Sequence, residues 1–190
     1  MRFEVYKQQV LARLDKSRKG SVDEPIKSFL EKINLHPSMV TLSSCSGRAM
    51  LLTPGKKKFE TQWHYVTHDV PGEALLRAYE QLHGSLPRLD FKYEGAILHV
   101  AVETLPLAWR FLRVAQEKGW KHSGILSVKK QHVVLELVIP LSLSTILGED
   151  TIWMPRDVFS LIVREAAEKQ RENWKRLEAL ERAFTKAFLP

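Results

Sequence analysis

The segment Ser43-Ser44-Cys45-Ser46-Gly47-Arg48 is the densest group of chemically versatile side chains in this sequence. It places three hydroxyls, a thiol, a glycine and a guanidinium between apolar flanks. Hydroxyls removed from water need hydrogen-bond partners, glycine permits close approach to the backbone, and arginine binds a carboxylate or phosphate through two parallel bonds. The segment therefore suits a ligand cradle. A strand end whose small polar residues satisfy a neighbouring backbone explains the same pattern, and the residues leave both interpretations open.

Several side chains near this segment suit proton transfer or nucleophilic attack. Cys45 could act as a nucleophile with His64 or His68 as its base, although a lone cysteine is more often a small buried hydrophobe. His68, Asp69 and His99 lie at or next to predicted strand ends, where an imidazole can accept a proton near neutral pH. Asp69 also has a simpler interpretation as a helix cap, and His99 as an ordinary sheet residue.

The sequence lacks the common nucleotide and metal signatures. It contains no G-x-G-x-x-G, P-loop, H-E-x-x-H or paired C-x-x-C motif. We therefore expect no metal site, and a nucleotide-like cofactor would have to be held without the usual glycine fingerprint.

The charge balance favours a polyanionic partner. The 29 Lys and Arg residues exceed the 22 Asp and Glu residues by 7, and such an excess attracts nucleic acid if it is gathered on one face. The densest runs are residues 16–19 and Lys56-Lys57-Lys58, with Lys129-Lys130 as a smaller one. Each run alone is equally consistent with a solvated surface. Among the five Trp residues, Trp63 and Trp153 are the best candidates for stacking on a base.

The elements that must position these residues alternate irregularly along the chain. Helices are predicted where apolar residues recur every three or four positions between capping and stop signals. They are expected at 3–14, from Pro25 to near Asn34, from Pro71 towards Gly84 with Asp69 as the cap, from Thr104 to before Gly119, and over about thirty residues from Pro155. Strands are expected at 39–42, 49–53, 63–67, 89–93, 97–102, 125–128 and 133–139, with a loop from Pro140 to Asp150.

This order predicts an α+β fold: a mixed or antiparallel sheet covered by helices, with a helical N-terminus and a long C-terminal helix. We expect a single domain over residues 1–190, because that length can bury one core without staples. One cysteine and the lack of a long apolar run predict a cytoplasmic protein without a membrane segment.

Several separated motifs resemble the tRNA wybutosine-synthesising protein 3 family. They are residues 14–23 (LDKSRKGSVD), residues 43–48 (SSCSGR), Trp63 with His68, residues 91–92 with 97–100, Ser123-Gly124-Ile125, and Glu172-Asn173 with Arg176. The likeness spans nearly the whole chain. The chain departs from the family pattern at Leu42, where threonine is common, and at Gly95-Ala96, where proline and an aromatic residue often stand.

The resemblance implies a stand-alone, non-Rossmann methyltransferase that uses S-adenosylmethionine. Its expected substrate is the N4 position of a tricyclic wyosine-type guanosine at position 37 of phenylalanine tRNA, contacted through the anticodon stem-loop. On this basis we expect cofactor contacts from Ser43, Ser44, Cys45, Ser46, Gly47, Arg48, His99, Ser123 and Gly124, proton removal by His68 or Asp69, and RNA contacts from Lys16, Lys19, Lys56, Lys57, Lys58, Trp63 and Lys92.

Two rival functions fit the residues less closely. A non-catalytic protein that presents tRNA to another enzyme would account for the missing cofactor fingerprint. A cysteine-dependent hydrolase would require a reactive Cys45 thiolate. The sequence leaves the oligomeric state open.

Overall fold

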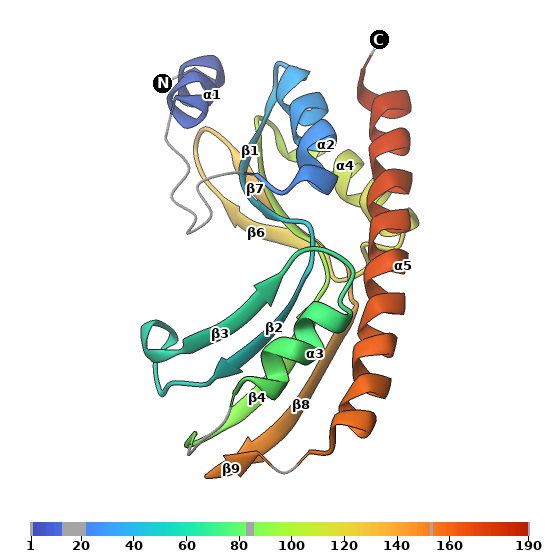
Figure 1. Cartoon of the computed structure of the whole chain (residues 1–190). Helices are drawn as coiled ribbons and strands as arrows, with labels where there is room; N and C mark the ends of the chain where they lie inside the picture. The colour runs from blue at the N-terminus through green and yellow to red at the C-terminus, as the bar shows by residue number, and fades with distance from the viewer. Residues whose placement is uncertain (1, 13–21, 83–85, 153, 190) are drawn as a thin grey trace. The chain divides into compact units, whose positions relative to one another are not determined.

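The computed structural model describes residues 2–12, 22–82, 86–152 and 154–189. The chain divides into two compact units, each assembled from separate stretches of sequence (Figure 1). Unit 1 comprises residues 1–46, 96–140 and 174–190, and unit 2 comprises residues 47–95 and 141–173. That the whole chain behaves as one domain stays a prediction.

Unit 1 is built on a four-stranded antiparallel sheet with the strand order β1-β5-β7-β6. Its strands are β1 (Met39–Cys45), β5 (Ile97–Val102), β6 (Gly124–Val128) and β7 (Val133–Val138), and its helices are α1 (Phe3–Leu11), α2 (Glu24–Leu35), α4 (Leu105–Glu117) and the C-terminal part of α5 (Arg156–Phe188).

The two faces of this sheet have different covers. Val40 and Ala101 on one face pack against Phe3 of α1. The alternate residues Leu98 and Val100 point to the opposite face and are fully buried. The strands β1, β5 and β7 contact α2 and α4 (Figure 1). On the face that packs against α1, residues that α1 does not cover can be polar.

The helices of unit 1 follow the predicted apolar spacing. The apolar face of α2 is buried, as the spacing of its Ile, Phe and Leu residues requires. Thr104 caps α4, because its Oγ1 accepts a hydrogen bond from the Leu107 amide at 3.4 Å. Gly119 follows that helix with φ +89°, the left-handed conformation that glycine adopts most easily.

Unit 2 is built on a five-stranded antiparallel sheet with the order β3-β2-β4-β8-β9. Its elements are β2 (Arg48–Thr53), the short 3₁₀ helix η1 (Lys58–Glu60), β3 (Gln62–Thr67), α3 (Glu73–Glu80), β4 (Leu89–Glu94), β8 (Ser142–Glu149), β9 (Thr151–Ile152) and the N-terminal part of α5. Its core joins sheet residues such as Leu51 and Phe91 to Tyr79 of α3 and Phe159 of α5. None of the described helices combines the length and apolar character that crossing a membrane requires.

The predicted α+β class is confirmed, with antiparallel strands, helices near the N-terminus and a long C-terminal helix. The strands, however, are divided between two sheets. The predicted loop from Pro140 to Asp150 is wrong, because residues 142–149 form β8 beside β4. The apolar alternation of this strand is broken where polar Thr145 is half-buried and apolar Ile146 is exposed, and its serines also favoured a loop.

The predicted cap of α3 also needs correction. The helix α3 begins at Glu73 with Gly72 in the cap position, so Asp69 lies too far upstream to cap it. The helix α2 begins at Glu24, one residue before the predicted Pro25, with Asp23 in the cap position.

Candidate functional site

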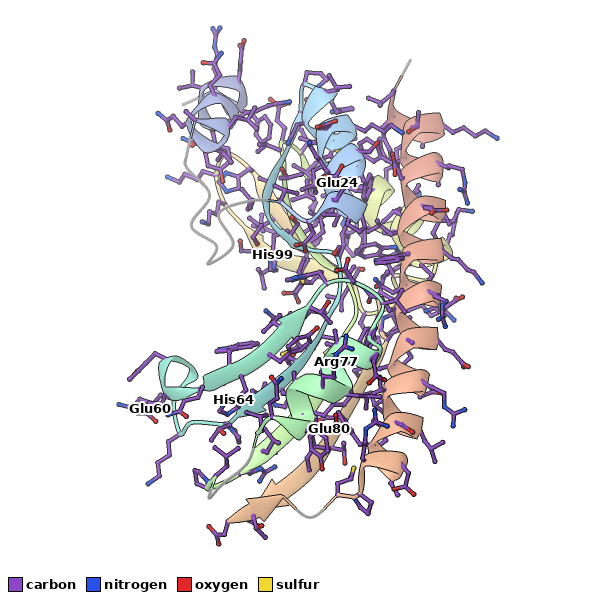
Figure 2. All side chains as sticks on the ribbon, viewed as in Figure 1. Glu24, Glu60, His64, Arg77, Glu80 and His99 are labelled. Carbon is purple, nitrogen blue, oxygen red and sulfur yellow. The ribbon has the colours of Figure 1, made fainter. Side chains whose placement is uncertain are left out.

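Four residues from four strands form one row across the unit 1 sheet, which we call the polar row. Ser43 of β1 pairs with His99 of β5, His99 pairs with Glu136 of β7, and Glu136 pairs with Gly124 of β6. The Ser43 hydroxyl lies 2.8 Å from His99 Nδ1, and His99 Nε2 lies 2.8 Å from Glu136 Oε2. The hydroxyl, the imidazole and the carboxylate are thus joined by two consecutive hydrogen bonds (Figure 2 labels His99).

A β-bulge in β1 creates this alignment. Thr41 pairs with Val100, but the next paired residue is Ser43 rather than Leu42, so Leu42 is the extra residue. Without the bulge, Leu42 would stand opposite His99 and Ser43 would point to the other face. The bulge therefore places the hydroxyl against the imidazole.

The polar row is open to solvent. Ser43 is exposed, and the side chains of His99 and Glu136 are 24% and 37% exposed. A Cβ added at Gly124 would meet no atom within 4 Å, so there is room beside this residue. The predicted cofactor residues Ser43, His99 and Gly124 are brought together here, from segments far apart in the sequence.

Ser123, by contrast, serves the fold of unit 1. It is 9% exposed, and its Oγ accepts a hydrogen bond from the Val138 amide at 2.9 Å. Its hydroxyl therefore ties the start of β6 to β7.

Ser46 is fully buried and is the last residue of the predicted ligand cradle that belongs to unit 1. Its amide and its Oγ both donate to Asp23 Oδ2, at 2.9 and 3.2 Å. The Asp23 carboxylate thus receives the end of the cradle instead of capping α2, where it makes no side-chain cap bond. Of the two interpretations of this segment, the structural one applies to Ser46, because its polar groups form hydrogen bonds within the protein.

Gly47 opens unit 2 with φ +95°, and its surroundings leave no space for a side chain. A Cβ there would lie 2.8 Å from Asn173 Nδ2 and 2.8 Å from Gln170 Oε1. Gln170 is fully buried; its Oε1 accepts from the Tyr93 hydroxyl at 2.9 Å, and its Nε2 donates to the His68 carbonyl at 2.8 Å. The close approach predicted for Gly47 is therefore made by side chains of α5.

Arg48 already has a carboxylate partner within unit 2. Its Nε and Nη2 donate to Glu94 Oε2 at 3.2 and 2.9 Å, and its guanidinium lies 5.0 Å from the centre of the Trp63 ring. Its side chain is 34% exposed, so this planar pair of Arg48 and Trp63 remains accessible. One face of the predicted stacking residue is consequently covered by a cation.

The predicted catalytic residues His68 and Asp69 follow β3 directly. The backbone amide of Asp69 donates to Thr67 Oγ1 at 3.1 Å, and Asp69 is exposed. The His68 side chain is half-buried, and its carbonyl is held by Gln170. The backbone here is fixed, while the Asp69 carboxylate faces solvent.

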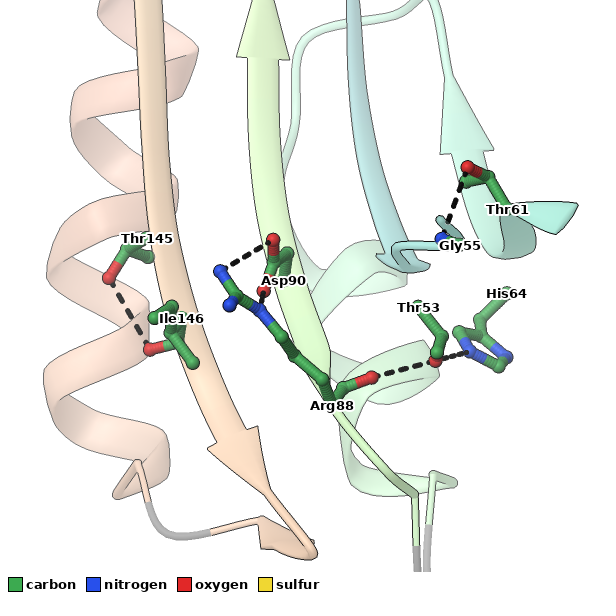
Figure 3. Close-up of polar contacts among 8 residues, drawn as sticks. All are labelled: Thr53, Gly55, Thr61, His64, Arg88, Asp90, Thr145 and Ile146. Carbon is green, nitrogen blue, oxygen red and sulfur yellow. Dashed lines mark hydrogen bonds and ion pairs between the residues drawn. The ribbon is translucent and has the colours of Figure 1, made fainter. Parts of the chain in front are cut away.

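The remaining candidate base, His64, is used in the fold of unit 2 (Figure 3). Its Nε2 lies 2.8 Å from Thr53 Oγ1, and that hydroxyl donates to the Arg88 carbonyl at 2.7 Å. Burial lowers the pKa of the His64 imidazole, which keeps the ring neutral near pH 7. Figure 3 shows the chain of bonds joining the ends of β2, β3 and β4.

A cationic turn connects β2 to β3. Lys56 and Lys57 are exposed, Phe59 is 80% exposed, and the Lys57 ammonium lies 5.7 Å from the centre of the Phe59 ring. Lys92 is half-buried in β4, where it pairs with Met50. Lys16, Lys19 and Trp153 lie outside the described residues, and nothing is described of the Lys58 side chain.

Sequence reasoning missed three residues that organise these surroundings. Glu136 is an isolated acidic residue inside the apolar strand 133–138, which was the available signal. Gln170 interrupts the apolar stripe of α5 four residues after Ala166. Phe59 directly follows the lysine run, but nothing in the sequence alone indicated its exposure.

Comparison with known proteins gives a consistent assignment. The model of the family described as Methyltransferase TYW3 matches residues 5–186. The chain is 31% identical over 200 residues to the tRNA wybutosine-synthesizing protein 3 homolog of Danio rerio, covering 99% of this chain and 76% of that protein.

This chain belongs to the TYW3 methyltransferase family.

Similar proteins also include one from Pyrococcus horikoshii and one from Aeropyrum pernix. The family member is 31% identical over 187 residues to tRNA(Phe) 7-((3-amino-3-carboxypropyl)-4-demethylwyosine(37)-N(4))-methyltransferase 1 of Pyrococcus horikoshii, covering 94% of this chain and 93% of that protein. Its structure is similar to that of the PH1069 protein from Pyrococcus horikoshii, with a TM-score of 0.86, 31% identity, and coverage of 96% and 97% of the two chains. A hypothetical protein from Aeropyrum pernix has a TM-score of 0.72 at 27% identity, with coverage of 84% of this chain and 95% of that chain.

The family assignment confirms the resemblance seen in the sequence and the prediction of a methyltransferase enzyme. Membership of the TYW3 methyltransferase family also removes the two rival functions, a non-catalytic tRNA-binding protein and a cysteine-dependent hydrolase.

Proposed function

We propose that this enzyme transfers a methyl group from S-adenosylmethionine to N4 of a wyosine-type base at position 37 of phenylalanine tRNA. The observation that carries the proposal is the match to the Pyrococcus horikoshii methyltransferase, whose name specifies this reaction. The match covers 94% of this chain and 93% of the relative, so the similarity is not confined to one part of either sequence.

The open space beside the polar row of unit 1 suits one part of the cofactor. S-adenosylmethionine, when bound, supplies a methyl group on a sulfonium centre. Its ammonium and ribose hydroxyls need acceptors and short polar contacts, which a carboxylate and serine hydroxyls provide. The open space beside Gly124 gives room for such a group. We assign cofactor contacts to Cys45 and Gly124, which share the face of the polar row; Ser44 pairs with Leu98 and therefore points to the opposite face.

The surroundings of the remaining predicted cofactor residues indicate other roles. Ser46, Gly47 and Ser123 are packed into the protein and would shape the site rather than touch the ligand. Arg48 bonds Glu94 through Nε and Nη2, so a ligand would be contacted by its remaining N–H groups or by exchange of that bond. The sequence-based proposal that His68 or Asp69 accepts the proton stands as the alternative to an acceptor within the polar row.

The tRNA contacts are proposed for unit 2. Lys56 and Lys57 offer charge to phosphates, and the exposed Phe59 ring offers a face on which an unpaired base can stack. The Trp63 ring under Arg48 offers a second platform. We propose that these side chains, with Lys16, Lys19, Lys58 and Lys92, contact the anticodon stem-loop.

Calorimetric titration tests the cofactor assignment. The purified protein should bind S-adenosylmethionine and its demethylated product saturably, with and without tRNA. Gly124→Val fills the open space beside the polar row and should weaken binding at least tenfold. Leu35→Ala, at a 72% exposed apolar residue of α2, is the control and should bind as the wild type does. Lack of binding by the wild type in either condition would exclude this methyl donor.

A further inference from the structure

The polar row fixes the protonation pattern of its histidine. An ionised carboxylate only accepts hydrogen bonds, so the bond between His99 Nε2 and Glu136 Oε2 requires hydrogen on Nε2. In the neutral ring Nδ1 is then an acceptor, and the 2.8 Å contact to Ser43 is a bond donated by the Ser43 hydroxyl. Glu136 therefore aims the basic nitrogen of His99 at Ser43.

This pattern leaves the Ser43 oxygen as an acceptor that faces outward. Its single hydrogen is committed to His99, no donor among the described residues is bonded to its lone pairs, and the residue is exposed. An N–H group arriving at this face would donate to Ser43, and its proton could pass through the hydroxyl to the imidazole. The resulting imidazolium would be stabilised by the carboxylate of Glu136.

We propose that Ser43, His99 and Glu136 form a proton relay that deprotonates the nitrogen to be methylated. The inference rests on the proposed function, and it assigns Ser43 and His99 to the methyl acceptor rather than to the methyl donor. Ser43 is the catalytic residue that touches the substrate nitrogen, while Glu136 is a positioning residue that acts through His99.

The balance of the step is as follows. The N–H bond of the base breaks, and its electron pair forms the new N–CH₃ bond as the S–CH₃ bond breaks and leaves its electrons on sulfur. The proton moves to Ser43 Oγ while the hydroxyl proton moves to His99 Nδ1. The net change is one proton gained by the relay, which returns to water before the next turnover.

The fold indicates that the contacts among Ser43, His99 and Glu136 are a specific arrangement and not a chance one. Three residues must share one register position on adjacent strands, and Ser43 reaches that position through the bulge at Leu42. Glu136 is the acidic member of an otherwise apolar strand. By comparison, the predicted acceptor Asp69 is exposed after the end of β3, and the bond described there is made by its backbone amide.

The tautomer can be measured without catalysis. Nitrogen-15 NMR of the wild type should show hydrogen on His99 Nε2 and none on Nδ1, and Glu136→Gln should produce a mixture of tautomers. Glu103→Gln is the matched control, because Glu103 is an exposed carboxylate that also bonds a serine, Ser38, at the end of β5. A wild-type ring protonated on Nδ1 would overturn the relay.

Kinetics test the catalytic role. Ser43→Ala and His99→Asn should lower kcat by about 10²–10⁴-fold, the usual contribution of a positioned acid or base, and Glu136→Gln by about tenfold or more. The KM for tRNA should stay within about twofold, and the double variant His99→Asn with Glu136→Gln should be no slower than His99→Asn alone, as expected of residues that act as a unit.

Two results would count against the relay in different ways. An active wild type whose Ser43→Ala and Glu136→Gln variants keep the full rate would overturn the relay and leave the proposed function standing. A wild type that methylates no wyosine-type base would overturn the proposed function, and the relay with it.

Discussion

Replacing Gly47 with alanine should destabilise unit 2, because both the backbone conformation and the packing at this position disfavour a Cβ. The backbone at Gly47 has φ +95°, and a left-handed conformation costs a residue with a Cβ about 1–2 kcal/mol. The new methyl would lie 2.8 Å from both Gln170 and Asn173, so the two buried amides must move. Moving Gln170 weakens its bonds to Tyr93 and to the His68 carbonyl, each worth about 1 kcal/mol.

The sum is about 3 kcal/mol, which lowers the melting temperature of a chain of this size by about 6–12 °C. Differential scanning calorimetry of the variant measures this shift. Gly124→Ala is the control, because a Cβ there meets nothing within 4 Å, and its melting temperature should match the wild type. A Gly47→Ala variant that melts within about 2 °C of the wild type would refute the close packing described around Gly47.

Four further predictions concern RNA binding and stability. Phe59→Ala should raise the Kd for tRNA about 5–100-fold in a filter-binding assay if its ring stacks on a base. Replacing Lys56 and Lys57 with alanine should reduce the slope of log Kd against log salt concentration by about 0.7–0.9 per lost phosphate contact. Leu35→Ala is the control for both and should bind tRNA as the wild type does. Burial lowers the pKa of His132 from 6.5, so the unfolded chain binds a proton more readily than the folded chain does. The free energy of unfolding should therefore fall as the pH drops below about 6.5. It should fall less steeply in His132→Phe, which keeps an aromatic ring stacked on Tyr6. The chain should unfold in one cooperative transition, as a single domain does, and two separate calorimetric transitions would refute that prediction.

Local sequence signals predicted most elements, because helices and hairpins obey short-range rules. The apolar spacing of α2 and the Thr104 cap of α4 are both found as predicted. The strand β8 was missed because polar Thr145 is half-buried and apolar Ile146 is exposed, which breaks the alternation of apolar and polar residues. The division into two sheets depends on pairings between distant strands, such as β1 with β5, for which a single sequence carries no signal.

The candidate site was predictable only in part. The serine-rich segment was noticed for its composition, and Ser43 and His99 do meet. That Glu136 completes the row follows from strand register, and that Ser46 faces Asp23 follows from tertiary packing. Neither partner could be chosen from residue types, because the chain contains 22 acidic residues of similar local appearance.

The most direct test of the central claim is methyl transfer to a defined tRNA. The enzyme would be incubated with S-adenosylmethionine that carries a deuterated methyl group and with phenylalanine tRNA bearing a 4-demethylwyosine-type base at position 37. Mass spectrometry of the released nucleosides should show one labelled methyl group on N4 of that base, and none on a tRNA with unmodified guanosine there. Labelling elsewhere in the tRNA, or no labelling by an enzyme that binds both ligands, would contradict the account.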